Sequence, residues 1–133
     1  MKKVLRYLCF VLLLLGGGSR GIWAQSTPVH SINAAFRTGD VPGIVRYMDN
    51  VMEITINNSQ STCSRAQAEM VLRDFFSRNE PRGFDADHHG DNGQSNTLFS
   101  IGYLNTSNGR YRVYILLKQR QGNFLLQEIR VEK

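Results

Sequence analysis

Apolar residues recur every three to four positions after residue 26, a spacing that predicts two short helices. Thr27 can cap the first helix with Pro28 at its first position, and Gly39 can end it in the left-handed conformation. Asp40 can cap the second helix. The apolar positions of the two helices are Val29, Ile32, Ala35 and Phe36, and then Val41, Ile44, Val45 and Met48.

An alternating pattern follows and predicts one strand. Met52, Ile54 and Ile56 alternate with polar residues, which is typical of a half-buried strand. The polar run at 57–62 is then predicted to be a loop or turn.

A third helix is predicted from its capping sequence. Ser64-x-x-Gln67 fits a capping box, and the helix it opens continues to about Arg78. The sequence Asn79-Glu80-Pro81 ends it. The apolar stripe of this helix is formed by Ala68, Val71, Leu72, Phe75 and Phe76.

The second half of the chain predicts an antiparallel sheet whose registers follow from two turns. Asn108-Gly109 suits a type I′ hairpin turn, because both residues tolerate a positive φ. Arg120-Gln121-Gly122 suits a three-residue loop with its glycine in the left-handed position. The predicted neighbours are Leu104 with Val113, Tyr103 with Tyr114, Leu117 with Leu125, Ile115 with Gln127, Val113 with Ile129 and Tyr111 with Val131.

These registers divide the side chains between two faces, and both faces are apolar. The core face carries Leu104, Val113, Ile115, Leu117, Leu125, Ile129 and Val131, and the second face carries Phe99, Ile101, Tyr103, Tyr114, Leu116, Phe124 and Leu126. A loop or long side chains could cover the second face, and so could a homodimer packed sheet to sheet. We favour the homodimer. The interface candidates are Phe99, Ile101, Tyr103, Tyr114, Leu116 and Leu126.

The same registers make Arg112 and Arg130 cross-strand neighbours on the second face. Like charges in that position repel unless an anion or an acidic partner lies between them. Glu128 and Glu132, diagonal to the two arginines, can relieve the repulsion without any ligand.

The first 24 residues are predicted to be a secretory signal peptide. Lys2, Lys3 and Arg6 precede the apolar run 8–15, which is too short to span a membrane, and Ala24 offers a cleavage site. The mature domain is then residues 25–133, and we expect it to be periplasmic or secreted.

Removing this segment changes the charge balance. The segment contains four of the 16 basic residues of the chain. The mature domain therefore has 12 basic and 11 acidic residues, and its net charge is about +1. Nucleic-acid binding needs a basic face and loses its support. Cys9 leaves with the segment, and Cys63 is expected to be buried and inert, with an intermolecular disulfide as the alternative.

Three runs of the sequence resemble a family of exported bacterial proteins, the domain-of-unknown-function 4783 family. They are 32–40 (INAAFxxGD), 64–70 (SRAQAEM) with 74–76 (DFF), and 106–114 (TSNGxYRVY), where x marks a position outside the match. The element order also resembles the nuclear transport factor two-like superfamily. This resemblance implies an α+β fold of cystatin-like or cone type, with three N-terminal helices on a curved, mostly antiparallel sheet. It also implies a cavity between sheet and helices and frequent dimerisation through the sheet.

The segment 85–93 (DADHHGDNG) carries the richest cluster of metal-ligand types. It superficially follows a calcium loop, but His89 replaces an oxygen ligand and Asn96 stands where a bidentate glutamate belongs. His88 and His89 are adjacent, and in a strand they point to opposite faces. We therefore predict no metal site and no cofactor.

Four residues are candidates for the cavity of the predicted cone. Ser100 and Gln127 interrupt the apolar face, Tyr111 lies near its rim, and His88 shares a side of its strand with Phe84. The sequence carries no recognisable pair of acid and base, no Ser/His/Asp set and no phosphate loop. We expect a non-catalytic domain that binds a small apolar or mixed ligand or acts as an interaction scaffold. The alternative is a small isomerase or dehydratase that uses His88 or a nearby carboxylate as its acid–base residue.

Overall fold

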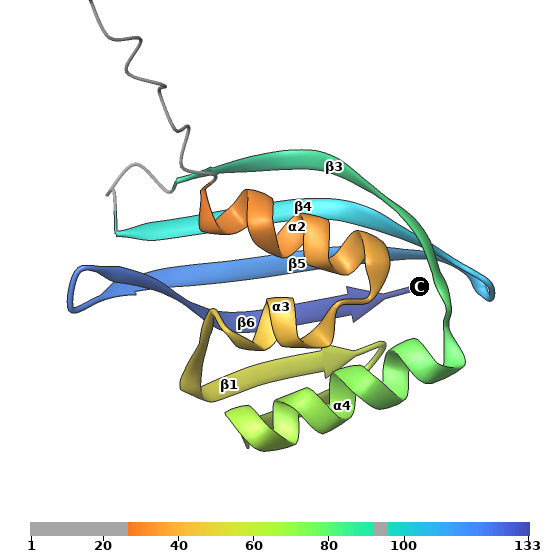
Figure 1. Ribbon diagram of the computed structural model, residues 1–133, viewed down its shortest axis with the longest axis horizontal. Helices are drawn as coiled ribbons and strands as arrows, with labels where there is room; N and C mark the ends of the chain where they lie inside the picture. The colour runs from red at the N-terminus through yellow and green to blue at the C-terminus, as the bar shows by residue number, and fades with distance from the viewer. Residues whose placement is uncertain (1–26, 92–95) are drawn as a thin grey trace, which may run out of the picture.

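The computed structural model describes residues 27–91 and 96–133, which form a layer of helices on one sheet (Figure 1). The predicted signal peptide lies outside the described residues. The helices are α2 (Pro28–Thr38), α3 (Val41–Val45) and α4 (Arg65–Arg78). The strands are β1 (Met48–Ile56), β2 (Ser59–Ser64), β3 (Pro81–Asp91), β4 (Thr97–Thr106), β5 (Gly109–Arg120) and β6 (Asn123–Glu132).

The six strands form a single sheet in the order β2-β1-β6-β5-β4-β3. β1 and β6 are parallel, and the other neighbours are antiparallel. The sheet curves around the helices, with α2 against β3 and β4, and α4 against β1 and β2 (Figure 1). The predicted α+β class, with helices on a mostly antiparallel sheet, is confirmed.

The predicted caps begin all three helices. The Thr27 hydroxyl accepts a hydrogen bond from the backbone N–H of His30 (3.3 Å) at the start of α2. The Asp40 carboxylate accepts one from the backbone N–H of Gly43 (3.1 Å) at the start of α3. Ser64 and Gln67 form a complete capping box at the start of α4. Gly39 ends α2 with a φ of 69°, in the left-handed region that glycine adopts without steric cost.

Two predictions next to β1 were wrong. Met48, assigned to the second helix, belongs to β1, and the expected loop at 57–62 contains a turn and most of β2. β2 lies at the edge of the sheet, and Cys63 is its one buried residue. Its sequence therefore lacks the alternation by which a strand is recognised.

The hairpin between β4 and β5 pairs two residues away from the predicted register. Its turn residues are Ser107 and Asn108, and Leu104 lies opposite Tyr111 rather than Val113. A shift by two keeps every side chain on its predicted face, because the side-chain period of a strand is two.

The hairpin between β5 and β6 differs by one residue at its closed end, and this change reverses faces. Gln121 and Gly122, with φ of 51° and 81°, form a two-residue turn, so Leu117 pairs with Leu126 instead of Leu125. Leu126 is fully buried, and placing it on the second face was wrong. Phe124, also assigned to that face, packs against the core.

A bulge at Gln127 restores the predicted faces farther along β6. The register changes between the pairs Leu117–Leu126 and Leu116–Glu128, which leaves Gln127 as the extra residue. Ile129 and Val131 are buried as predicted. The predicted neighbours Arg112 and Arg130 do not meet, because the even shift sets Arg112 opposite Glu132 and Arg130 opposite Tyr114.

The core lies between the helices and one face of the sheet. Its largest fully buried side chains include Phe36, Met48, Met52, Leu104, Ile115 and Leu126. Cys63 is buried at its margin, as predicted, and desolvation raises the pKa of its thiol. A thiol with a raised pKa stays protonated and unreactive at neutral pH.

The second face of the sheet keeps much of its predicted apolar character. Its half-buried residues are Phe99, Ile101, Tyr103, Tyr114 and Leu116, together with Leu125, which was wrongly predicted on the core face. In the described part of the chain, no helix has the length and apolar character needed to cross a membrane.

Candidate functional site

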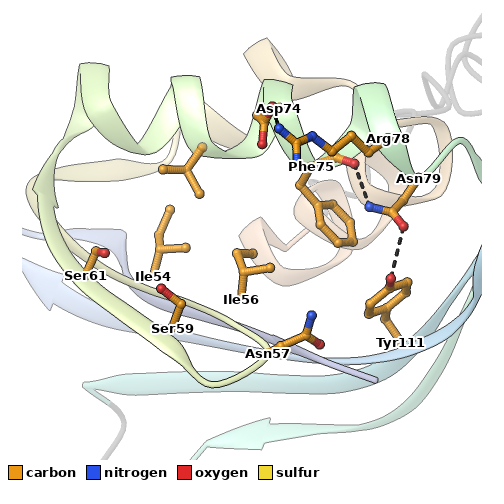
Figure 2. A pocket seen from close by; sticks show the side chains of 11 residues that line it. Ile54, Ile56, Asn57, Ser59, Ser61, Asp74, Phe75, Arg78, Asn79 and Tyr111 are labelled. Atoms are coloured by element: carbon orange, nitrogen blue, oxygen red, sulfur yellow. Dashed lines mark hydrogen bonds and ion pairs between the residues drawn. The ribbon is translucent and has the colours of Figure 1, made fainter.

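A pocket of about 340 Å³ lies between α4 and the hairpin of β1 and β2. Figure 2 shows its side chains converging from the helix and the two strands. The apolar lining residues are Ile54, Ile56, Val71 and Phe75, and the others are Asn57, Ser59, Ser61, Asp74, Arg78, Asn79 and Tyr111. Apolar walls with a few polar groups are typical of small-ligand sites.

A hydrogen-bond network fixes one end of the pocket (Figure 2). The Tyr111 hydroxyl donates to Asn79 Oδ1 (3.0 Å), and Asn79 Nδ2 donates to the Phe75 carbonyl (2.9 Å) at the end of α4. Asn108 Nδ2 also donates to Asn79 Oδ1 (3.3 Å). Tyr111 packs edge-on against Phe75, with ring centroids 5.2 Å apart. Both polar side chains are therefore held in place before any ligand binds.

The charges at the rim of the pocket are balanced. Arg78 and Asp74, one turn apart on α4, form an ion pair of 3.2 Å, and their side chains are 75% and 60% exposed. An exposed pair of this kind contributes little to stability. Its effect on the pocket is to leave the rim without net charge.

Two of the four predicted cavity residues, Tyr111 and Ser100, lie on the helix side of the sheet, but in different places. Tyr111 lines the pocket under α4. Ser100 is buried beneath α2 and donates to Asn33 Oδ1 (3.1 Å). Ser100 is thus a satisfied core hydroxyl that does not line this pocket.

Gln127 faces the start of β1 instead of the pocket. Its side-chain amide donates to Asp49 Oδ2, and Arg120 lies 3.2 Å from the same carboxylate oxygen. The backbone N–H of Asn50, the Gln127 amide and Arg120 hold the pKa of Asp49 below its usual range. These contacts tie the β6 bulge to β1. We therefore assign Gln127 a structural role, whereas the sequence predicted that it lines the cavity.

His88 lies on the second face of the sheet, so placing it beside Phe84 at the cavity was wrong. A bulge between Ala86 and His88 shifts the register of β3, and the exposed His88 ring lies 5.9 Å from Phe99. His89 takes the helix side and lines a shallow depression with His30. Among the described residues, no three histidine, cysteine or acidic side chains are grouped so as to hold a metal ion.

Sequence reasoning missed the polar residues that α4 contributes to the pocket. Asn79 and Arg78 were read only as the end of the third helix, and Asp74 only as part of a family-like run. The sequence signal that could have identified Asn79 is its position as an amide side chain at the end of an amphipathic helix. A buried amide there can donate a hydrogen bond to one of the last backbone carbonyl groups of the helix.

This arrangement, a layer of helices on a curved six-stranded sheet with a pocket between them, is an α+β fold similar to that of solved nuclear transport factor two-like (NTF2-like) proteins. The family model described as "Domain of unknown function (DUF4783)" matches residues 29–132. The chain belongs to this family, and the predicted resemblance is confirmed.

Solved structures of the same family are similar to this chain. A DUF4783 protein from Bacteroides fragilis is 31% identical, with a TM-score of 0.74, over 81% of this chain and 99% of that one. A second, from Bacteroides ovatus, is 28% identical, with a TM-score of 0.74, over 77% of this chain and 92% of that one.

A wider comparison extends the fold beyond the family. An NTF2-like protein from Cytophaga hutchinsonii is 10% identical, with a TM-score of 0.58, over 79% of this chain and 91% of that one. At that identity the likeness concerns the fold alone. A search of the curated proteins finds no match.

Proposed function

We propose that the protein is an exported, non-catalytic binding domain whose pocket beneath α4 holds a ligand with apolar and polar surface. The observation that carries the proposal is the hydrogen-bonded pair of Tyr111 and Asn79, which fixes polar groups beside the apolar wall of Phe75 and Ile56. Such preorganisation lowers the entropic cost of binding.

The acid–base character of the lining residues favours binding over catalysis. The pocket is lined by one carboxylate, Asp74, which is exposed and paired with Arg78. Proton abstraction calls for a desolvated base whose pKa is raised toward neutrality. The isomerase or dehydratase alternative named His88 or a nearby carboxylate, and the place of His88 on the opposite face of the sheet counts against its use as the base.

Filling the pocket is expected to remove the ligand. Native mass spectrometry of the protein isolated from its own host should show the mass of residues 25–133 together with a small-molecule or peptide adduct. Val71→Trp, which adds an indole to the pocket wall, should lose the adduct. Met70→Trp is the matched control, because Met70 neighbours Val71 but is 71% exposed. An adduct retained by Val71→Trp would contradict the proposed site, and a mass that includes residues 1–24 would contradict export.

The second face of the sheet supports a homodimer as a further part of the proposal. Six apolar or aromatic residues are half-buried there, and burial and Glu128 raise the pKa of Tyr114 on this face. Arg110 stacks 4.0 Å from the Tyr103 ring centroid and supplies a polar margin. An apolar centre with a charged margin is typical of protein interfaces.

A charge in the centre of that face is expected to separate the dimer. Leu116→Glu should weaken association by about 30-fold, because a carboxylate would lose its hydration in the interface. Analytical ultracentrifugation over a concentration series measures the change. Lys118→Glu, two residues along the same face of β5, is the control and should associate like the wild type. A wild-type protein that is monomeric throughout would contradict the dimer.

A further inference from the structure

The two edge strands of the sheet are protected to different degrees. β3 begins with a proline, carries several charged residues and has two register shifts, all of which discourage pairing with another chain. β2 (SQSTCS) has neither charge nor proline, and its register with β1 is continuous. Within the described part of the chain, β2 has a strand neighbour on one side only. Its other side is an unprotected edge.

The backbone groups on that edge can be identified from the register. β1 and β2 are joined by the two-residue turn 57–58, so Ile56 and Ser59 form a hydrogen-bonded pair and every second pair after them does too. The N–H and C=O groups of Gln60 and Thr62 therefore point away from β1. Both residues are exposed. They offer two donors and two acceptors to an added strand.

The same edge borders the pocket under α4. Ser59 and Ser61 line the pocket, and their side chains lie on the helix side of the sheet (Figure 2). A strand added next to β2 would set the side chain opposite Ser61 on that same side. This side chain would enter the pocket towards Val71 and Phe75.

We propose that the ligand of this pocket is an extended polypeptide segment that pairs with β2 as a seventh strand and inserts one uncharged apolar side chain beneath α4. The inference rests on the proposed binding function and names its ligand class. The paired charges of Asp74 and Arg78 leave the rim neutral, which suits an uncharged side chain. Strand addition of this kind draws affinity from the backbone and specificity from the side-chain pocket.

A second copy of the chain fits this edge less well. If two β2 strands paired with each other, the partner's side chains on the pocket side would be small ones, Ser59, Ser61 and Cys63. The pocket wall of Ile54, Ile56 and Phe75 would then stay unfilled. A peptide with an aromatic or branched apolar residue opposite Ser61 would fill the pocket and pair with the edge of β2 at the same time.

A display library of random octapeptides, selected on the full-length protein, tests the proposal. We expect enrichment of sequences with β-forming residues around one apolar position. Ser61→Phe should abolish binding of the synthesised winning peptide, because the ring would occupy the pocket. Met70→Phe, which adds a ring to the exposed side of α4 outside the pocket, is the matched control and should bind. A library without enrichment, or a peptide that both variants bind equally, would overturn the inference.

The backbone pairing has its own test. Thr62→Pro removes an N–H from the free edge and should weaken binding by about tenfold, whereas Thr62→Val should not. N-methylation of single peptide residues probes the same hydrogen bonds without changing the protein. It should weaken binding at every second residue only, either the odd-numbered or the even-numbered ones. Equal affinity of peptides methylated at odd-numbered and at even-numbered residues would contradict strand addition.

The native adduct separates this inference from the proposed function. An adduct of a small molecule that is lost in Val71→Trp, with no peptide enriched, would uphold the pocket and overturn the peptide. An empty pocket together with no enriched peptide would overturn both.

Discussion

Phe36→Ala is expected to lower the free energy of unfolding by about 3–5 kcal/mol, the usual cost of removing a buried aromatic ring. Phe36 is fully buried in α2, and its ring centroid lies 6.1 Å from that of Phe76 and 6.0 Å from that of Phe84. It joins α2 to both α4 and β3. Urea denaturation followed by circular dichroism measures the change.

The control for this substitution is Arg37→Ala. Arg37 is the next residue of α2, and it is exposed. Substitutions at such positions usually change stability by less than about 0.5 kcal/mol. A loss below about 1 kcal/mol for Phe36→Ala would mean that the three rings do not form the centre of the helical layer.

Asn79→Ala is expected to destabilise the protein by about 2 kcal/mol, because it leaves the buried Tyr111 hydroxyl without its hydrogen-bond partner. The Tyr111 hydroxyl and Asn108 Nδ2 both donate to Asn79 Oδ1, and Asn79 itself is buried. The same substitution should weaken ligand binding, since Tyr111 would no longer be held against Phe75. Urea denaturation gives the first quantity, and native mass spectrometry gives the second.

A double-mutant cycle with Tyr111→Phe isolates the hydrogen bond. The ring of Tyr111 would still pack on Phe75, so Tyr111→Phe removes the hydroxyl alone. We expect a coupling free energy between the two sites of about 0.5–3 kcal/mol. If the two effects were simply additive, the hydrogen bond would not contribute to the stability of the pocket.

The helices and their caps could be predicted from the sequence because they depend on local contacts. Thr27, Asp40 and Ser64 each bond to backbone groups within three residues. The core residues of β4 and β5 could also be predicted, since an error of two residues in register keeps every side chain on its face.

The candidate site could be predicted only in part. Tyr111 was found because its spacing of two residues from Val113 places it on the buried face of β5. His88 was misplaced because it follows a bulge, and Gln127 because it is itself the bulged residue; a bulge is set by contacts across the sheet. The Asp49 carboxylate that Gln127 bonds is 78 residues away in the chain.

The sequence by itself determined the helices, their N-terminal caps, the α+β class and most of the buried face. The tertiary structure decided which polar residues meet and which edge is left unpaired. β2 looked like a loop because an edge strand of small polar residues has no alternation, and it became a strand by pairing with β1. The pocket exists because α4 packs back onto the hairpin of β1 and β2. The local sequence does not indicate such packing, because it depends on contacts between separate elements.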